Sequence, residues 1–325
     1  MEDSVEIKTS TAVLDLRARI AQALKPTIVG LEREIDACLI AMLAGGHVLL
    51  EGPPGVAKTM LVRSIAAALG GSFGRIQFTP DLMPADVTGT SVFHPTRGAF
   101  EFQPGPVFAN VLLCDEINRA PAKTQSALLE AMQEASVTVD GQRHALPEPF
   151  AVFATMNPIE HEGTYPLPEA QLDRFLLKIL IGYPSAESEA ELIAKAHARP
   201  LNASPESLGV RAVASMQDIE AARAAVRAVS VREDLPPYIV RLLGATRQDR
   251  ALVMGASPRA GVMLLAAAKA RAALEGRDYV TPDDVKAVFL PALRHRVLLD
   301  PAEEIEGTSS DEVLRRILDS QEVPR

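Results

Sequence analysis

Five short apolar runs alternate with helical stretches in the first 185 residues of the chain. The runs are bounded by polar or turn-forming residues and read as buried strands. They cover residues 47–51, 75–79, 110–115, 150–156 and 176–181. Between them, the spacing of apolar residues predicts helices over 59–69 and 121–135. Strands that alternate with helices predict an α/β fold, in which helices cover both faces of a parallel sheet.

The pattern changes after Tyr183 and Pro184, because from there the chain reads as helices only. Helices are predicted over 185–198, 216–229, 235–246 and 257–276, and a further one opens at 281. Ser215 with Asp218, and Ser257 before Pro258, are helix-start signals. We therefore divide the chain into four parts. They are an N-terminal helical segment (1–25), an αβα core (26–199), an all-α domain (200–300) and an acidic C-terminal tail (301–325) with one short helix near 311–318.

Composition and charge argue against two classes of partner. The chain has a formal net charge of −9 and no Trp, so it has no overall basic character and few aromatic residues for base stacking, although a local basic channel stays open as an alternative. The most apolar stretch, residues 37–50, is too short to span a bilayer, and the acidic N-terminus shows no signal peptide. Cys38 and Cys114 are predicted to be buried free thiols. We therefore expect a cytoplasmic protein without a membrane partner and with nucleic acid unlikely as a partner.

A glycine-containing loop joins the first predicted strand to the first helix that follows it. Such a loop binds phosphate when its backbone N–H groups converge, a lysine reaches the β and γ oxygens, and a hydroxyl holds Mg²⁺. Lys58 and Thr59 supply the last two groups, while Ala57 stands where the usual pattern has glycine. A simple Gly-rich turn is the alternative, but the strand before and the helix after favour ATP binding. The predicted ATP contacts are Gly52, Pro53, Pro54, Gly55, Val56, Ala57, Lys58, Thr59, Met60 and Asp115.

Two carboxylates, Asp115 and Glu116, end the third predicted strand. Ligands bind at the carboxyl edge of a parallel sheet, so these groups should face the phosphate loop. We expect Asp115 to hold Mg²⁺ together with Thr59, and Glu116 to polarise the attacking water. The alternative is an acidic pair that merely caps a strand end.

Seven sequence motifs, spread over residues 30–296, resemble those of the MoxR family of AAA+ ATPases. The family's characteristic loop, in which alanine precedes the lysine, matches Ala57 and Lys58. The resemblance implies a P-loop AAA+ αβα domain with a helical lid, and ATP in the cleft between them. The matching segments are 46–52, 57–59, 115–121, 154–158, 167–175, 255–260 and 293–296.

The resemblance also implies roles that spacing alone does not. Asn157 matches the sensor 1 position, which orients the lytic water; without the family match, an Asn-Pro turn is the better interpretation. Arg174 matches the arginine finger, which reaches the ATP of a neighbouring subunit. Arg259 matches sensor 2 in the lid, and Val29 and Gly30 match the segment that lines the adenine pocket. The alternative for Arg174 is a solvated arginine before a buried strand, and the alternative for Arg259 is an arginine in the first turn of a helix.

Other residues near these motifs receive plainer interpretations. Arg119 and Glu130 lie near the site in the family pattern, but we assign them no role. The triplet 294–296 is interpreted as cations at a helix C-terminus, where the dipole favours them. The six histidines and two cysteines lack metal-ligand spacing, so no structural zinc is expected. Residues 87–108 match a hairpin insert of this AAA+ branch; with a hairpin turning at residues 140–141, it either faces a central pore or only packs on the surface.

The function implied by the resemblance is ATP hydrolysis by a ring, a hexamer, that drives chaperone-like remodelling or maturation of a partner protein. The partner commonly carries a von Willebrand factor A domain. Three alternatives stay open from the sequence: a nucleic-acid-stimulated motor, a nucleotide-gated scaffold that barely hydrolyses ATP, and the ATPase subunit of a metal chelatase.

Overall fold

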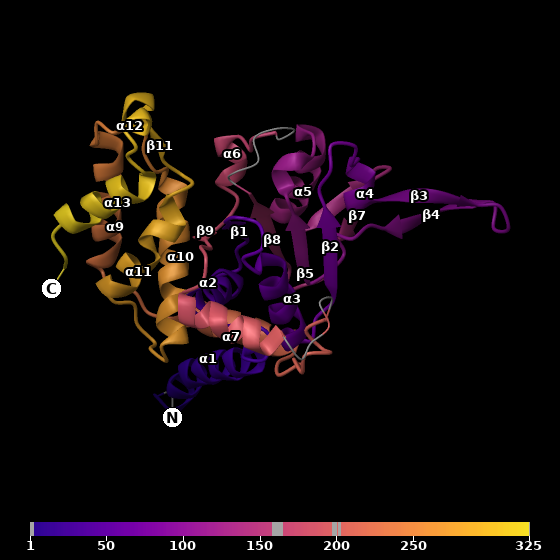
Figure 1. The fold of residues 1–325 in the computed structure, drawn as a ribbon, viewed down its shortest axis with the longest axis horizontal. Helices are drawn as coiled ribbons and strands as arrows, with labels where there is room; N and C mark the ends of the chain where they lie inside the picture. The colour runs from indigo at the N-terminus through magenta and orange to yellow at the C-terminus, as the bar shows by residue number, and fades with distance from the viewer. Residues whose placement is uncertain (1–2, 158–164, 197–199, 201–202, 325) are drawn as a thin grey trace.

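A five-stranded parallel sheet forms the centre of the molecule (Figure 1). The computed structural model describes residues 3–157, 165–196, 200 and 203–324. The strand order is β2-β5-β8-β1-β9, and every neighbouring pair is parallel. The bounds are β1 Val48–Glu51, β2 Phe73–Gln77, β5 Val111–Asp115, β8 Ala151–Met156 and β9 Leu177–Leu180. All five predicted strands are therefore confirmed, with ends that differ by one or two residues.

The register brings the ends of the central strands to one edge of the sheet. Glu51 at the end of β1 pairs with Met156 at the end of β8, and Gln77 at the end of β2 pairs with Asp115 at the end of β5. Parallel strands end at the same edge, and crossover connections supply the helices on each face. The phosphate loop, the carboxylate pair and Asn157 consequently lie at one edge.

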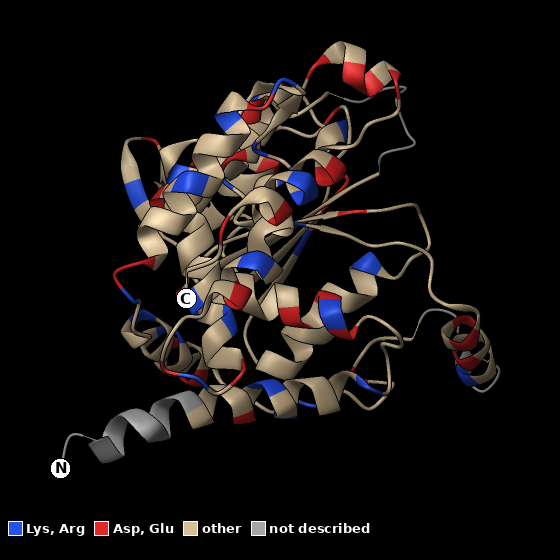
Figure 2. Cartoon of the chain, turned by 90° about the vertical axis from the view of Figure 1, so that its left-hand side faces the viewer, with Lys and Arg blue, Asp and Glu red and all other residues tan. Residues whose placement is uncertain are grey.

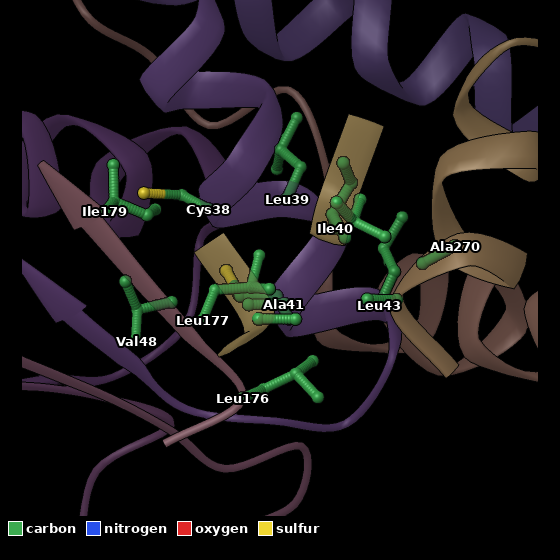
Figure 3. Packing of buried hydrophobic residues seen from close by; sticks show 14 of the residues in the cluster. Cys38, Leu39, Ile40, Ala41, Leu43, Val48, Leu176, Leu177, Ile179 and Ala270 are labelled. Carbon is green, nitrogen blue, oxygen red and sulfur yellow. The ribbon is translucent and has the colours of Figure 1, made fainter. Parts of the chain in front are cut away.

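Helices of the αβα core cover the sheet as the sequence pattern predicts. Alternate residues of β1 face opposite clusters, because Val48 and Leu50 belong to one hydrophobic core and Leu49 to the other. Figure 3 shows helix α2 in the first core, with Cys38 beside Ile179 of β9 and Leu43 beside Ala270 of α10. The core helices are α2 Glu32–Leu43, α3 Lys58–Leu69, α4 Pro84–Thr88, the 3₁₀ turn η1 Ile117–Arg119, α5 Ala122–Glu134, α6 Glu169–Leu172 and α7 Ala186–Ala196. Residues 197 and 198 of the helix predicted over 185–198 lie outside the described residues.

The C-terminal part is helical but also contains a small sheet. Strands β10 Leu252–Met254 and β11 Leu298–Leu299 pair antiparallel, so the prediction of helices only was wrong. They are too short to show an alternating pattern in sequence, and their pairing joins segments more than forty residues apart. The helices here are α8 Met216–Ala228, α9 Leu235–Gln248, α10 Pro258–Leu274, α11 Pro282–Leu293, α12 Pro301–Ile305 and α13 Ser310–Ser320.

The C-terminal segment contains two helices, α12 and α13, rather than the single one expected. Helix α13 buries Val313, Leu314 and Ile317 in the main hydrophobic core and contacts α9 and α11. Its N-terminus is a capping box, in which Ser309 and Glu312 satisfy each other's backbone N–H groups. Helix α13 therefore packs onto the helical domain.

One continuous hydrophobic core crosses the predicted domain boundaries. Helix α1, Asp3–Leu24, buries Val13, Leu16, Ile20 and Leu24 in the same core as α2, α3 and α10, and α10 contacts both α1 and α2. The helical domain thus packs against the αβα core at α1, α2 and the edge strand β9 (Figure 1). The boundaries at 25, 199 and 300 stay predictions.

Two antiparallel hairpins project from the core beyond the sheet. One is β3 Gly89–His94 with β4 Ala99–Pro104, which extends furthest from the body in Figure 1. The other is β6 Ser136–Val139 with β7 Gln142–Ala145, and its turn at Asp140 and Gly141 has positive φ at both residues, as the Asp-Gly pair predicts. Phe102 stacks on His144 with ring centroids 3.9 Å apart, which joins the two hairpins. No helix among the described residues is long and apolar enough to cross a membrane.

The buried imidazole of His47 makes folding sensitive to acid. Its Nδ1 accepts a hydrogen bond from the Val152 N–H at 3.1 Å, so the proton sits on Nε2, 3.2 Å from the Met132 carbonyl. Burial lowers the pKa of His47 to about 4. The unfolded chain therefore takes up this proton near pH 6.5 and the folded chain does not, so acid favours unfolding.

We expect the free energy of unfolding to fall by about 2 kcal/mol between pH 7 and pH 5 through His47 alone. Chemical denaturation at both pH values would measure it, with His47→Gln as the comparison. The loss in the wild-type protein should exceed the loss in the variant by that amount. An equal loss in both proteins would contradict the assignment.

Candidate functional site

The loop between β1 and α3 has the conformation of a phosphate-binding loop. A side chain at Gly52 would place its Cβ 2.1 Å from the Ile181 carbonyl oxygen, so only glycine fits there. Gly55 has a φ of +85° and open space around it. Ala57 also adopts the left-handed region, with a φ of 62°, at a cost of roughly 1–2 kcal/mol. The alanine that departs from the usual glycine pattern thus keeps the glycine-like backbone.

Lys58, the first residue of α3, places its ammonium group across this loop. Its Nζ donates to the carbonyl of Gly52, to that of Pro53 at 3.2 Å and to that of Met156 at 3.4 Å. Met156 ends β8, so the lysine lies between the loop and the carboxyl edge of the sheet. A cation at the N-terminus of a helix opposes the helix dipole unless an anion is bound nearby. This arrangement suits a phosphate group.

Thr59 and Asp115 lie side by side at the same edge. The Thr59 hydroxyl donates to Asp115 Oδ1 at 3.2 Å, and the Thr155 hydroxyl lies 3.3 Å from the same oxygen. A hydroxyl next to a carboxylate is a hard-oxygen pair of the type that Mg²⁺ prefers. Among the described residues no group of three or more His, Cys, Asp or Glu side chains gathers into a metal site. These two oxygens therefore fit an ion whose other ligands are water and phosphate.

The position of Glu116 at the edge of the sheet is fixed by its own backbone and by two side chains. Its φ is 57°, and its N–H donates to the Thr155 hydroxyl at 2.9 Å. Its Oε2 accepts hydrogen bonds from Gln77 Nε2 and from Arg119, both at 3.0 Å. A non-glycine residue with positive φ at a strand end is a frequent feature of functional sites.

Two residues of strand β2 belong to the site although the sequence analysis missed them. Arg75 donates to Asp115 Oδ2 at 2.8 Å, and Gln77 contacts Glu116 as described above. They stand two residues apart on one edge strand and so point the same way. Polar residues at alternate positions of a predicted strand are the signal that could have drawn attention to them.

The site opens as a cleft of about 440 Å³, within the usual size range of small-molecule sites. Asn157 follows β8, is buried and lines this cleft. Of the predicted ATP contacts, Gly52, Pro53, Val29 and Gly30 are not among the lining residues. The lining residues are Pro54, Gly55, Val56, Ala57, Lys58, Thr59, Met60, Arg63, Arg75, Gln77, Asp115, Glu116, Thr155, Met156 and Asn157.

The lining of this cleft comes from the core alone, and the expectation that ATP binds between the core and the helical domain stays a prediction. The helical domain contacts the core at α1, α2 and the edge strand β9. Gly30 lies against α7, where an added Cβ would meet Ser188 Oγ at 2.7 Å. Pro158, in the motif that contains Asn157, lies outside the described residues.

Arg174 and Arg259 contact other parts of the chain than the cleft lining. Arg174 donates to the Leu129 carbonyl of α5 at 2.6 Å. Arg259, in the first turn of α10, lies 3.6 Å from Asp173, the residue before Arg174, and its side chain is 52% exposed. Neither lines the cleft described above. The structure therefore joins Arg259 to the residue that precedes Arg174, and neither arginine is part of the cleft lining.

Comparisons with known proteins agree with this geometry. Residues 47–177 match the family model "ATPase family associated with various cellular activities (AAA)", and residues 244–317 match "AAA lid domain". The chain is 46% identical over 310 residues to "Chaperone MoxR1" of Mycobacterium tuberculosis, covering 93% of this chain and 80% of that protein. It is 47% identical over 289 residues to "Uncharacterized protein YeaC" of Bacillus subtilis, covering 88% of each.

A solved structure covers the whole chain. It comes from Cytophaga hutchinsonii, is described as "a putative ATPase", and aligns over 100% of both chains with a TM-score of 0.91 and 40% sequence identity.

Proposed function

From the premise that the chain belongs to the MoxR family of AAA+ ATPases and is an ATP-hydrolysing enzyme, we propose that it acts as a hexameric ring that remodels a partner protein. The observation that carries the proposal is that neither Arg174 nor Arg259 lines the cleft of its own chain, while Arg259 pairs with Asp173, the residue before Arg174. Cations outside their own cleft can serve catalysis if a neighbouring copy presents its cleft to them. A closed ring supplies such a neighbour to every subunit.

In the proposed reaction, the loop and Lys58 hold the phosphates of ATP. The backbone N–H groups around Gly55 and the N-terminus of α3 favour the negative charge. The Lys58 ammonium, now near three carbonyl oxygens, is positioned to contact the β and γ phosphate oxygens. We propose that Val29 and Gly30 lie against the adenine ring.

Thr59 and Asp115 are the residues that would hold Mg²⁺. The ion, when bound, would neutralise charge on the phosphates and on the leaving group. Arg75 occupies Asp115 Oδ2 at 2.8 Å, while Oδ1 faces Thr59 at 3.2 Å. The carboxylate can therefore keep its arginine partner on one oxygen and present the other to the ion.

Glu116 and Asn157 would prepare the attacking water. A carboxylate at this point accepts a proton from water as the bond to the γ-phosphorus forms. Asn157 follows β8, the strand next to β5, which ends at Asp115. It would orient the same water. Because Gln77 and Arg119 now contact Glu116 Oε2, its Oε1 is the atom we assign to the water.

Arg174 and Arg259 complete the site of the neighbouring subunit in this proposal. Arg174→Ala should leave ATP binding intact and lower kcat by roughly 10³-fold, since charge on the transferred phosphoryl group is no longer stabilised. Steady-state ATPase assays and binding of a fluorescent ATP analogue would measure the two effects.

Mixing Arg174→Ala with Glu116→Gln subunits tests whether the arginine acts between chains. An interface between an intact cleft and an intact arginine then forms at roughly a quarter of the positions in a randomly mixed ring. Activity should therefore return to a fraction of that order. If every mixing ratio stays inactive, the arrangement between chains is refuted.

The two hairpins are the proposed contact with the client protein. Phe93 and Phe100 lie on the β3–β4 hairpin, are 49% and 72% exposed and pack on each other with ring centroids 5.3 Å apart. Exposed aromatic pairs are suited to gripping apolar segments of a polypeptide. In a ring these hairpins would face the central pore. The client or its adaptor is proposed to carry a von Willebrand factor A domain and to meet the ring in the cytoplasm.

A motor that acts on nucleic acid is a less well supported function for this enzyme. Figure 2 shows Lys and Arg interspersed with Asp and Glu over the face it presents, and the chain carries a net charge of −9. A binding surface for nucleic acid requires a continuous basic stripe.

Capture of a partner with the Glu116→Gln protein tests the remodelling role. The protein locked with ATP should retain a partner protein from native lysate, identified by mass spectrometry, and should release it when ADP replaces ATP. Phe100→Ser, on the exposed hairpin, should weaken that capture without changing the basal ATPase rate. Capture that is the same with ATP, with ADP and with Phe100→Ser would argue against nucleotide-driven remodelling.

A further inference from the structure

The end of helix α11 holds the chain segment that carries Arg174. Arg296, two residues after the C-cap of α11, is 5% exposed. Its guanidinium binds the main chain at both sides of Arg174, because it donates to the Asp173 carbonyl at 3.2 Å and to the Phe175 carbonyl. It also donates to the carbonyls of Leu176 and Ala292. The planar, five-donor shape of arginine suits this role, and lysine could not make all these bonds.

His295 adds a further hydrogen bond to the segment that carries Arg174. Its Nε2 lies 2.9 Å from the Phe175 carbonyl. Burial, together with the adjacent Arg296 charge, lowers the pKa of His295 well below its ordinary value, so the ring is neutral. A carbonyl only accepts, so the proton sits on Nε2 and the Phe175 oxygen receives donors from two residues of the helical domain.

Asp173 connects this buried arginine to the exposed one. Its Oδ1 accepts from Arg296 Nε at 2.7 Å, and its Oδ2 lies 3.6 Å from Arg259 Nε. The Asp173 side chain is 24% exposed and that of Arg296 2%, so the row of charges runs from the interior to the surface.

Hydrogen bonds fix the main chain around Arg174, whereas its guanidinium contacts a main-chain carbonyl of α5. Its N–H donates to the Gln171 carbonyl at 3.2 Å, and the carbonyls before and after it are bound by Arg296. The guanidinium donates to the Leu129 carbonyl of α5, a neutral acceptor that a phosphate would readily outcompete. The segment is thus a rigid base for a side chain that can exchange partners.

We propose that Arg296, acting through Asp173, is a positioning residue that sets Arg174 and Arg259 as one unit toward the nucleotide of the neighbouring subunit. The inference rests on the proposed function, in which these two arginines act between chains. It assigns to the helical domain the task of aiming the arginine of the αβα core, and it gives the 294–296 triplet a role that its helix-end position alone does not.

Asp173→Asn is the variant that tests this. It keeps the size of the side chain and an acceptor oxygen for Arg296, but removes the charge that holds Arg259. We expect kcat to fall about tenfold or more, because small misplacements of catalytic groups are costly. Affinity for a fluorescent ATP analogue should stay within about twofold, since the cleft of the same chain is untouched. Ring assembly, followed by sedimentation velocity, should be unchanged.

Complementation separates positioning from a merely structural role. Asp173→Asn subunits mixed with Glu116→Gln subunits should regain activity, because an intact cleft then meets an intact arginine unit. Arg296→Lys protein that folds should also show a lower kcat and should also regain activity when mixed with Glu116→Gln subunits. Asp311→Asn is the matched control, because Asp311 pairs with Arg294 of the same helix end at 2.8 Å without contacting Asp173 or Arg259; its kcat should stay within about twofold of wild type.

The kcat values and the mixing experiments decide whether Arg296 and Asp173 position the two arginines. An unchanged kcat for Asp173→Asn, a failure to complement, or an equal loss of kcat in Asp311→Asn would overturn it. Failure of the proposed function looks different: Arg174→Ala itself would then keep wild-type activity. If Arg174→Ala is inactive and complements while Asp173→Asn is fully active, only the positioning role falls.

Discussion

Lys58→Ala should bind ATP at least 100-fold more weakly than the wild-type protein. The ammonium group lies across the phosphate loop, within 3.4 Å of the carbonyls of Pro53 and Met156. Contacts between an ammonium and phosphate oxygens contribute about 1.5–3 kcal/mol each, and two of them give this factor. ATPase activity at ordinary ATP concentrations should be lost with the binding.

Isothermal titration or a fluorescent ATP analogue would measure the change in affinity. Lys123→Ala is the matched control, because Lys123 is an exposed lysine of α5 outside the cleft lining. Its affinity should equal that of the wild-type protein. Affinity for Lys58→Ala within about threefold of wild type would contradict the assignment of the loop.

Glu116→Gln should bind ATP normally and hydrolyse it at least 100-fold more slowly. The amide has the shape of the carboxylate and still accepts hydrogen bonds from Gln77 and Arg119, which lie 3.0 Å from Glu116 Oε2. It cannot take the proton of the attacking water, and loss of a general base costs typically 10²–10⁴-fold in rate. ATP should therefore accumulate on the protein.

Rapid filtration of protein-bound ATP, together with steady-state phosphate release, would follow both effects. Glu130→Gln makes the same chemical change on an exposed position of α5 and should leave turnover unchanged. Normal turnover by Glu116→Gln would falsify the role of Glu116.

Lys58 and Glu116 could be predicted from the sequence because local rules place them. A phosphate loop is continuous in the chain, and its neighbours on both sides showed the strand and helix patterns that such a loop requires. Asp115 and Glu116 follow an apolar run, and the end of a buried parallel strand faces the ligand edge. The five strands themselves were visible as apolar runs, and the register then brought their ends together.

Local rules could not predict the residues that reach the site from a strand far away in the sequence. Arg75 and Gln77 meet Asp115 and Glu116 across 40 and 39 positions of the chain. That meeting depends on β2 lying beside β5, which the strand order decides. Because one sequence pattern is compatible with several strand orders, periodicity alone could not have assigned these two residues to the site.

The placement of the helical domain shows the division between sequence and structure most clearly. The sequence by itself determined the phosphate loop, the carboxylate pair and the helical nature of the C-terminal part, since each follows from neighbouring residues. Only the tertiary structure decided that this part packs against α1, α2 and β9, and that Arg296 meets Asp173 from 123 positions away. Burial of a shared apolar surface is a non-directional force that depends on whole faces of helices, so the partner that each face selects becomes visible only when the chain is folded.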